Sequence, residues 1–324
     1  MRVLVTGAGG FLGKALVQAF VERGCLVRAL TRWKTDSKWP PGVEETVGDV
    51  TDPACQDRIL SGVQAVVHAA ARVTTEGSWE DFASVNVRAT MALLEKSVGH
   101  GVACFVHVSS LSVYDVPHDN YTVTETSPYE SEANARGHYS RSKLAADRLV
   151  LWEAKRGLPA MVLRPGLLWG PGRRPPLARQ SFLRNGWCFL LARRDYPLPL
   201  SHVRSVADAA VCAVEKGPGV GGHAFNVIDA HVPQKLWTEA YRELSGAKWR
   251  PVYLPVSAIG GAVLLAERGL SFIGRRPPVS YHQIARATRR AYYDSSCAQK
   301  LLGWTPRVNW REDLREVFES LKSS

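Results

Sequence analysis

Tyr139 and Lys143 stand four positions apart in the stretch GHYSRSKLAADRL, residues 137–149, which has the pattern of a helix. Residues at i and i+4 share one face of a helix, so a phenol and an ammonium group at these positions can cooperate. A free phenol has a pKa of about 10, and a nearby positive charge lowers it toward the range where proton transfer is efficient. The same spacing also occurs by chance, so the surrounding elements must decide whether the pair is catalytic.

A glycine-rich turn follows the first strand pattern, in VTGAGGFLG. Gly7, Gly10 and Gly13 are spaced three and three, and a helix pattern begins inside the motif. Such a turn lets the backbone approach a pyrophosphate, which then lies against free N–H groups at a helix N-terminus. Its place directly after a first strand favours dinucleotide binding over a glycine turn without a ligand.

Strand and helix patterns alternate along the first two thirds of the chain, and this alternation must position both motifs. Parallel strands separated by helices predict an α/β fold with a doubly wound parallel (Rossmann) sheet. The predicted strands cover 2–7, 26–32, 65–70, 104–110, 160–165 and 223–229, and the predicted helices cover 11–24, 81–99, 205–217 and the stretch that carries Tyr139.

The pattern changes after Pro165, which predicts two domains. Residues 1–165 and about 202–228 would form the dinucleotide-binding domain. Residues 166–201 and 229–324 would form a smaller, mostly helical substrate lobe, in which 166–201 is loop with a short helix. Four tryptophans are expected as packing anchors of the C-terminal part: Trp237, Trp249, Trp304 and Trp310.

Composition restricts the class of protein. The chain has 324 residues, 45% of them hydrophobic and 22% charged, as in a soluble globular protein. Its six cysteines include no Cys-x-x-Cys pair, and it begins without a secretory pattern, so we expect no metal site and a cytoplasmic location. The net charge is +11, but the basic residues are scattered doublets, which favours anionic small ligands over nucleic acid.

The apolar stretch 256–274 contains Glu267 and Arg268 and falls short of the roughly 20 clean residues of a membrane span. We expect a buried helix there. A helix that lines an apolar pocket or touches a membrane surface is the less favoured interpretation.

The chain resembles the extended short-chain dehydrogenase/reductase superfamily over most of its length. The spacing of the glycine loop, Asn86 in SVNVRAT, HVSSLSVYD and YSRSK occur in the order typical of that family. GDVTD, VHAAA, LRPGLLWGPG and LLGWTP add further matches. This combination favours the catalytic interpretation of Tyr139 and Lys143.

The resemblance implies a role for each matching residue. Tyr139 exchanges a proton with the substrate oxygen, Ser110 hydrogen-bonds that oxygen, Lys143 holds the cofactor ribose, and Asn86 completes the catalytic set. Dimerisation through 81–99 and 136–156, giving a homodimer, is also implied. The implied cofactor residues are Gly7, Gly10, Phe11, Leu12, Gly13, Thr31, Arg32, Asp49, Val50, Ala69, Ala70, Ala71, Ser109, Tyr139, Lys143, Pro165, Gly166 and Leu168.

Departures from the family pattern restrict the range of activities that we expect. Thr31 and Arg32 stand where many members have an acid, which favours NADP over NAD, although NAD remains an alternative. Leu111 and Ser112 replace the Asp-Glu pair of sugar-nucleotide dehydratases, which argues against dehydration. Leu167 replaces an asparagine of many nucleotide-sugar enzymes, and the pattern resembles 3β-hydroxysteroid dehydrogenases and dihydroflavonol reductases.

We therefore predict an NAD(P)-dependent oxidoreductase that interconverts a hydroxyl and a ketone on a hydrophobic small molecule, such as a sterol, terpenoid or flavonoid. A nucleotide-sugar epimerase with tightly bound NAD is the first alternative. A non-catalytic dinucleotide-binding protein is the second. The residues expected to wall the substrate pocket are Val113, Leu167, Trp169, Phe182 and Trp187, with Phe189 as a further candidate.

Overall fold

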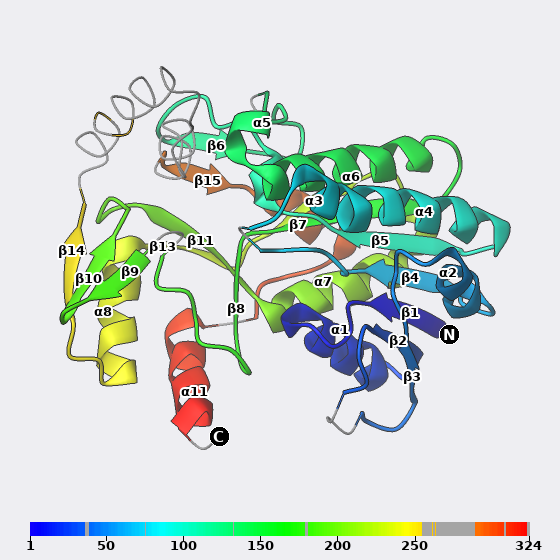
Figure 1. Ribbon diagram of the computed structural model, residues 1–324, viewed down its shortest axis with the longest axis horizontal. Coiled ribbons are helices and arrows are strands. Elements are labelled where there is room, and N and C mark those ends of the chain that lie inside the picture. The colour runs from blue at the N-terminus through cyan, green and yellow to red at the C-terminus, as the bar shows by residue number, and fades with distance from the viewer. Residues whose placement is uncertain are drawn as a thin grey trace.

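Seven parallel strands form the central sheet, in the order β12-β7-β5-β4-β1-β2-β3 (Figure 1). The strands are β1 (Arg2–Thr6), β2 (Leu26–Thr31), β3 (Val43–Val47), β4 (Ala65–His68), β5 (Cys104–Val108), β7 (Ala160–Pro165) and β12 (Ala224–Val227). The computed structural model describes residues 1–35, 39–74, 76–131, 133–178, 181–254, 261, 263, 289–307 and 309–322. The predicted doubly wound parallel sheet is confirmed.

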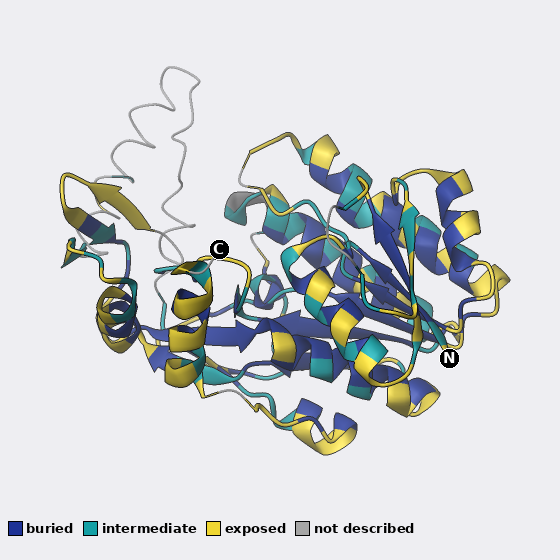
Figure 2. Cartoon of the chain, turned by 90° about the horizontal axis from the view of Figure 1, so that it is seen from below, coloured by how far each residue is buried: buried dark blue, intermediate teal, exposed yellow. Residues whose placement is uncertain are grey.

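Helices cover both faces of this sheet because its inner strands are apolar on both sides. On one face α1 (Phe11–Glu22) packs against α7 (Val203–Lys216), and both contribute to one large apolar core. The other face carries α2 (Pro53–Leu60), α4 (Ala89–Gly99) and α6 (His138–Ala154), around a second core. Figure 2 shows the buried sheet between helices whose outer faces are exposed.

Two elements depart from a regular alternation. Strand β3 was not predicted, because its sequence VEETV is charged and its residues are only half-buried or exposed at the sheet edge. Between α3 (Trp79–Ala83) and α4 the predicted helix 81–99 passes through a π-helical turn at Ser84–Arg88. That turn carries Asn86, and π-helical turns are frequent at functional sites.

The prediction for residues 166–201 was wrong, because this segment forms four strands instead of loop and short helix. They are β8 (Leu167–Trp169), β9 (Ser181–Arg184), β10 (Trp187–Leu190) and β11 (Pro197–His202). Asn185 and Gly186 both have positive φ, at 48° and 76°, and make the tight turn that joins β9 to β10. Strand β11 pairs with β8 and with β13 (Ala230–Pro233), so distant segments stabilise these short strands.

After residue 229 the described chain is mainly helical, as predicted. It contains α8 (Gln234–Ser245), a π-helical turn at Ala298–Leu302 and α11 (Trp310–Lys322). Three short strands accompany them, namely β13, β14 (Arg250–Tyr253) and β15 (Ala291–Tyr293), which pairs with β6 (Tyr121–Val123). Trp237 and Trp304 are buried, and Trp249 and Trp310 pack against the core of this lobe, which confirms them as anchors.

Apart from residues 261 and 263, the predicted helix 256–274 lies outside the described residues. Within the described part of the chain, no helix combines the length and the apolar character that crossing a membrane requires.

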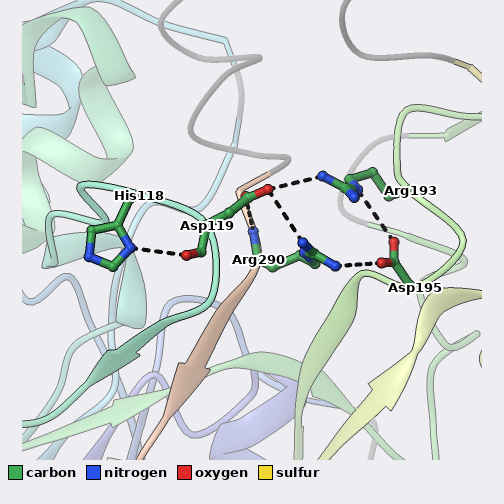
Figure 3. Close-up of polar contacts among 5 residues, drawn as sticks. All are labelled: His118, Asp119, Arg193, Asp195 and Arg290. Carbon is green, nitrogen blue, oxygen red and sulfur yellow. Dashed lines mark hydrogen bonds and ion pairs between the residues drawn. The ribbon is translucent and has the colours of Figure 1, made fainter.

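A charged cluster joins three loops, which precede β6, β11 and β15 (Figure 3). Arg193 Nη1 donates to Asp119 Oδ2 at 2.9 Å, and Arg290 Nη1 donates to Asp195 Oδ2 at 2.6 Å. The backbone N–H of Arg290 donates to Asp119 Oδ1 at 3.0 Å. The His118 ring reaches the backbone oxygen of Asp119. Each cation of this cluster therefore has an acidic partner.

Candidate active site

A cleft of about 1300 Å³ opens at the carboxyl ends of the central strands. This is the side on which open α/β sheets bind ligands. All the predicted cofactor residues, together with Ser110 and Leu167, line it. Segments far apart in the sequence, from the glycine loop to the chain after β7, are thus brought to one cavity.

The glycine loop closes one wall of the cleft. Gly7 has a φ of +69°, and a Cβ at this position would lie 2.8 Å from the backbone N of Ala70. A Cβ on Gly13 would lie 2.0 Å from the backbone oxygen of Gly7. Gly10 caps α1 without a side-chain hydrogen bond, and the first turn of α1 contains no acid. The residues fit a pyrophosphate, because they leave both space and unopposed N–H groups for it.

The rim beside β2 and β3 carries charge of both signs. The Thr31 hydroxyl donates to Glu45 Oε1 at 3.0 Å, and the Thr35 N–H and hydroxyl donate to the same oxygen at 3.0 Å. Glu45 therefore holds the two ends of the segment that carries Arg32. The Arg32 side chain is exposed and lines the cleft.

Asp49 faces the same rim. Its Oδ1 accepts hydrogen bonds from the Thr51 N–H and hydroxyl, both at 2.8 Å. The Thr51 backbone hydrogen bond, with a smaller effect of the Arg32 charge, lowers the pKa of the Asp49 carboxyl. An ionised Asp49 can accept hydrogen bonds from a ribose or an adenine amino group.

Ser110, Tyr139 and Lys143 meet at the other end of the cleft. Ser110 follows β5, and its hydroxyl accepts a hydrogen bond from the Ser112 N–H at 3.1 Å. Tyr139 and Lys143 lie on α6, as the spacing predicted. The Lys143 ammonium group is buried and donates to the backbone oxygen of Val108 at 2.8 Å.

The pKa of Tyr139 does not respond to the Lys143 charge as the sequence led us to expect. Burial raises the pKa of the Tyr139 phenol, and a side-chain hydrogen bond with Ser110, instead of the Lys143 charge, opposes that rise. Burial lowers the pKa of the Lys143 ammonium group to about 8, and the Asp147 charge opposes that fall. Burial thus favours the uncharged form of both the Tyr139 phenol and the Lys143 amine.

Asn86 is buried and does not line the cleft. Its Oδ1 accepts from the Arg72 N–H at 2.7 Å, and its Nδ2 donates to the Arg72 oxygen at 3.1 Å and to Ser142 Oγ at 2.9 Å. Ser142 in turn donates to the backbone oxygen of Tyr139 at 2.8 Å. Asn86 therefore joins the loop after β4 to the start of α6, where it positions Tyr139.

A buried ion pair supports α6 one turn beyond Lys143. Arg164 contacts both oxygens of Asp147, with Nε–Oδ2 at 2.9 Å and Nη2–Oδ1 at 2.6 Å. Tyr129 donates to Asp147 Oδ1 at 2.9 Å and accepts from Arg164 at 2.8 Å. Arg164 also donates to the Tyr114 hydroxyl, which donates to Asn226 Oδ1 at 2.8 Å. Every charged group of the pair has hydrogen-bond partners.

Of the residues predicted to wall the substrate pocket, Leu167 lines the cleft and four do not. Val113 and Trp169 are buried in packed cores, at 0% and 1% exposure. Phe182 and Trp187 lie on β9 and β10 and are 54% and 42% exposed, and Phe189 stacks on Phe182 with ring centroids 4.8 Å apart. Val113 and Trp169 thus serve packing, and the other three residues lie in a small sheet of β14, β10 and β9.

Several cleft residues were not predicted from the sequence. Trp33 and Lys34 follow Arg32 directly, so the same reasoning about the end of β2 could have included them. Residues in the loop after β4, on α3, on the π-helical turn and at the start of α6 or just before it had no comparable signal, because only the folded chain brings them to the cleft. The unpredicted lining residues include Trp33, Lys34, Val73, Thr74, Phe82, Val85, Arg136 and His138.

Comparison with known proteins places this site among related ones. A model of the NAD dependent epimerase/dehydratase family matches residues 3–227. The 2-alkyl-3-oxoalkanoate reductase of Stenotrophomonas maltophilia (strain K279a) is 28% identical over 335 residues, which cover 99% of each chain. The 3 beta-hydroxysteroid dehydrogenase/Delta 5-->4-isomerase of Mycobacterium tuberculosis (strain CDC 1551 / Oshkosh) is 27% identical over 347 residues, covering 99% of this chain and 92% of that protein. The solved structure of MoeE5 in complex with UDP-glucose and NAD has a TM-score of 0.76 and 26% identity, and covers 100% of this chain and 99% of its own.

Proposed function

Since this chain belongs to the NAD dependent epimerase/dehydratase family, we propose that it is an NAD(P)-dependent oxidoreductase that interconverts a hydroxyl and a ketone on a hydrophobic small molecule. One observation carries this proposal: the Ser110, Tyr139 and Lys143 side chains share a single cleft with the glycine loop. Apolar side chains of the same cleft, among them Val73, Phe82, Val85, Leu111 and Leu167, suit a hydrophobic substrate. Two relatives named above are a reductase and a hydroxysteroid dehydrogenase.

Tyr139, Ser110 and Lys143 each have a different role in the proposed reaction. When bound, the nicotinamide supplies the hydride for ketone reduction. Tyr139 donates the proton to the carbonyl oxygen, and the Ser110 hydroxyl donates a hydrogen bond to that oxygen. Lys143 uses one of its three N–H donors on Val108, so two remain for the ribose hydroxyls of the cofactor.

Substitution of Tyr139 tests this function. Tyr139→Phe keeps the packing of the ring and removes the proton, so turnover should fall by the roughly 10²–10⁴-fold typical of general acid catalysis. NADPH binding, followed by fluorescence titration, should stay near the wild-type value. Tyr292→Phe is the matched control, because Tyr292 is exposed on β15 outside the cleft. A drop smaller than about tenfold in Tyr139→Phe would show that the proton comes from another group.

We further propose a preference for NADP over NAD. Arg32 and Lys34 border the cleft where the adenosine ribose would lie, and Glu45 already accepts three hydrogen bonds from Thr31 and Thr35. A 2′-phosphate would therefore meet cationic side chains at this rim. Loss of one charge-assisted contact costs about 1.5–3 kcal/mol, or roughly 10–100-fold in affinity.

Calorimetric titration of both cofactors can test this preference. Arg32→Ala should weaken NADPH binding by that factor and leave NADH binding almost unchanged. The control is Arg23→Ala, an exposed arginine of the α1–α7 surface that pairs with Glu215. Equal affinities of the wild type for NADPH and NADH would refute the preference.

A nucleotide-sugar epimerase remains the second candidate, supported by the similarity to MoeE5 and by Arg173 and Arg174 in the cleft. Two other arginines that could bind a diphosphate are not in the cleft. Arg193 belongs to the charged cluster of Figure 3, and Arg194 lies over the Tyr253 ring. Copurified NAD that does not exchange would favour the epimerase, whereas absence of turnover on every substrate would favour a dinucleotide-binding protein.

We also propose a cytoplasmic homodimer. Helices α4 and α6 carry apolar side chains that the single chain leaves exposed: Met91 at 41%, Val98 at 57% and Trp152 at 53%. These exposed apolar side chains lie on the helices of the expected dimer interface, where a second chain would cover them. All six cysteines are free, in keeping with a reducing compartment. Light scattering coupled to size exclusion should give twice the 35.7 kDa chain mass, and Trp152→Glu should return the single-chain mass.

A further inference from the structure

An exposed apolar surface lies outside the cleft, on the small sheet of β14, β10 and β9 at one end of the molecule (Figure 1). All four residues of β9 are exposed. The β9–β10 hairpin leaves three large apolar side chains in solvent, Phe182, Leu183 and Trp187, which we call the hairpin patch. None of the three lines the cleft, so the proposed reaction gives them no role.

The hairpin patch extends over both faces of the sheet. Phe182 pairs with Phe189 in the antiparallel register, and the two rings stack. Trp187 lies on the same face as Phe189, because alternate residues of a strand share a face. Leu183 pairs with Cys188, which is buried on the opposite face. Strand β9 is at the edge of the small sheet, so this edge exposes apolar side chains on both sides.

The charge around the hairpin patch is positive. Three exposed cations surround it, namely Arg184, Lys248 and Arg250, and the Arg250 guanidinium lies 5.8 Å from the centroid of the Trp187 ring. Residues 181–190 and 246–254 contain no aspartate or glutamate. Among the residues that the structure describes, no ion pair joins any of the three cations to an acidic side chain.

These features distinguish among the surfaces that could cover the hairpin. A folded partner protein that packed on one face would leave the apolar side chains of the other face in water. A second copy related by a two-fold axis would bring the same cations together without any acidic residue of the hairpin to balance them. An anionic lipid surface matches both features, because its interface surrounds apolar and tryptophan side chains and its headgroups attract Lys and Arg.

We infer that the β9–β10 hairpin docks this protein on anionic phospholipid membranes. The hairpin patch enters the boundary between headgroups and acyl chains, and the three cations contact the headgroups. Insertion is shallow, because the free edge of β9 has backbone groups that need water or headgroups as partners. The inference concerns where the protein works and does not depend on the proposed reaction.

Vesicle flotation tests this inference with the full chain. Vesicles of phosphatidylcholine alone are compared with vesicles of equal parts phosphatidylcholine and phosphatidylglycerol. A cation near an anionic membrane strengthens binding roughly fivefold, so the wild type should bind the anionic vesicles roughly 100-fold more tightly. Arg184→Gln/Arg250→Gln should weaken that binding roughly 30-fold. Phe182→Ser/Leu183→Ser should weaken it at least about tenfold, because the apolar side chains no longer enter the lipid.

Two matched variants serve as controls. Leu26→Ser removes an apolar side chain of β2 that is 53% exposed, and Arg23→Gln removes a surface cation that pairs with Glu215. Both should bind anionic vesicles like the wild type. Circular dichroism should show the same folded spectrum for all variants, since every substituted residue is exposed.

Three results would overturn the inference. The first is a wild-type protein that floats with neither kind of vesicle. The second is equal binding of the wild type and of folded Phe182→Ser/Leu183→Ser to anionic vesicles. The third is a loss of binding in the two control variants as large as in the hairpin variants, which would mean that the general surface charge and apolar area, and not this hairpin, contact the lipid.

Discussion

Replacement of Asp147 by asparagine should expose how much the buried ion pair contributes to the fold. Asp147 and Arg164 are 0% and 1% exposed, and two direct contacts at 2.9 and 2.6 Å join them. An asparagine keeps one acceptor oxygen but turns an amide NH₂ toward the N–H groups of Arg164. The variant therefore loses one charge-assisted hydrogen bond and leaves a buried guanidinium without a counter-ion.

The cost follows from that geometry. Breaking a buried pair by removing one partner costs about 3–5 kcal/mol in the free energy of unfolding. In a chain longer than 250 residues the melting temperature falls by about 2 °C per kcal/mol, which gives a decrease of roughly 6–10 °C. Differential scanning calorimetry measures this directly. The same variant should lower the apparent pKa of Lys143 in the pH profile, because the Asp147 charge raises that pKa.

A surface pair supplies the control. Arg23 and Glu215 lie 3.0 Å apart with about half of each side chain exposed, so Glu215→Gln should cost less than about 1 kcal/mol. The double variant Asp147→Leu/Arg164→Met should recover much of the stability, because an apolar pair of similar volume leaves no charge buried. A melting temperature of Asp147→Asn within the error of Glu215→Gln would refute this account of the ion pair.

Four further predictions concern the cleft and the residues that support it. Ketone reduction should decline as pH rises through about 8, because the Lys143 ammonium group then loses its proton; a flat profile of kcat/KM across that range would contradict it. The same residue should make the free energy of unfolding increase with pH from about 8 to its ordinary value near 10.4, since the unfolded chain binds the extra proton there. Gly7→Ala should weaken cofactor binding more than tenfold, because the added Cβ would lie 2.8 Å from the backbone N of Ala70. Gly24→Ala is the control, because Gly24 has a φ of +72° but no neighbour within 4 Å, so this variant should show the cost of the backbone conformation alone. Equal effects of the two variants in NADPH titration would argue against a tight loop. Asn86→Ala should lower kcat while NADPH affinity stays near wild type, because it frees the loop at Arg72 and the start of α6; unchanged steady-state kinetics would remove its positioning role.

The sequence predicted the sheet well where periodicity is strong. Strands such as β4 and β5 are fully buried and apolar except for one histidine each, as expected of strands covered on both faces. Strand β3 and the strands of 166–201 escaped prediction because their stability comes from distant pairing. Strand β11, for example, contains two prolines and is held between β8 and β13.

The candidate site likewise contains residues that the sequence predicted and residues that it did not. The glycine loop, Ser110, Tyr139 and Lys143 stand in short motifs at strand ends or one helix turn apart, so the topology alone brings them to one edge. The substrate wall depends on how the lobe folds back, which the motifs do not encode. Trp169 therefore lies in the core, whereas Arg174, five positions later, lines the cleft.

The place of β12 in the sheet sets an order of events during synthesis. Six strands have emerged by residue 165, but the seventh, which pairs with β7, follows only after residues 166–223. Until then the β7 edge stays open, and Tyr114 lacks its acceptor Asn226, which β12 supplies. A chain whose synthesis stops before β12 thus presents an unpaired sheet edge. Such an edge promotes aggregation and can be bound by chaperones. The last strand therefore closes the sheet late, only after residues 166–223 have been synthesised.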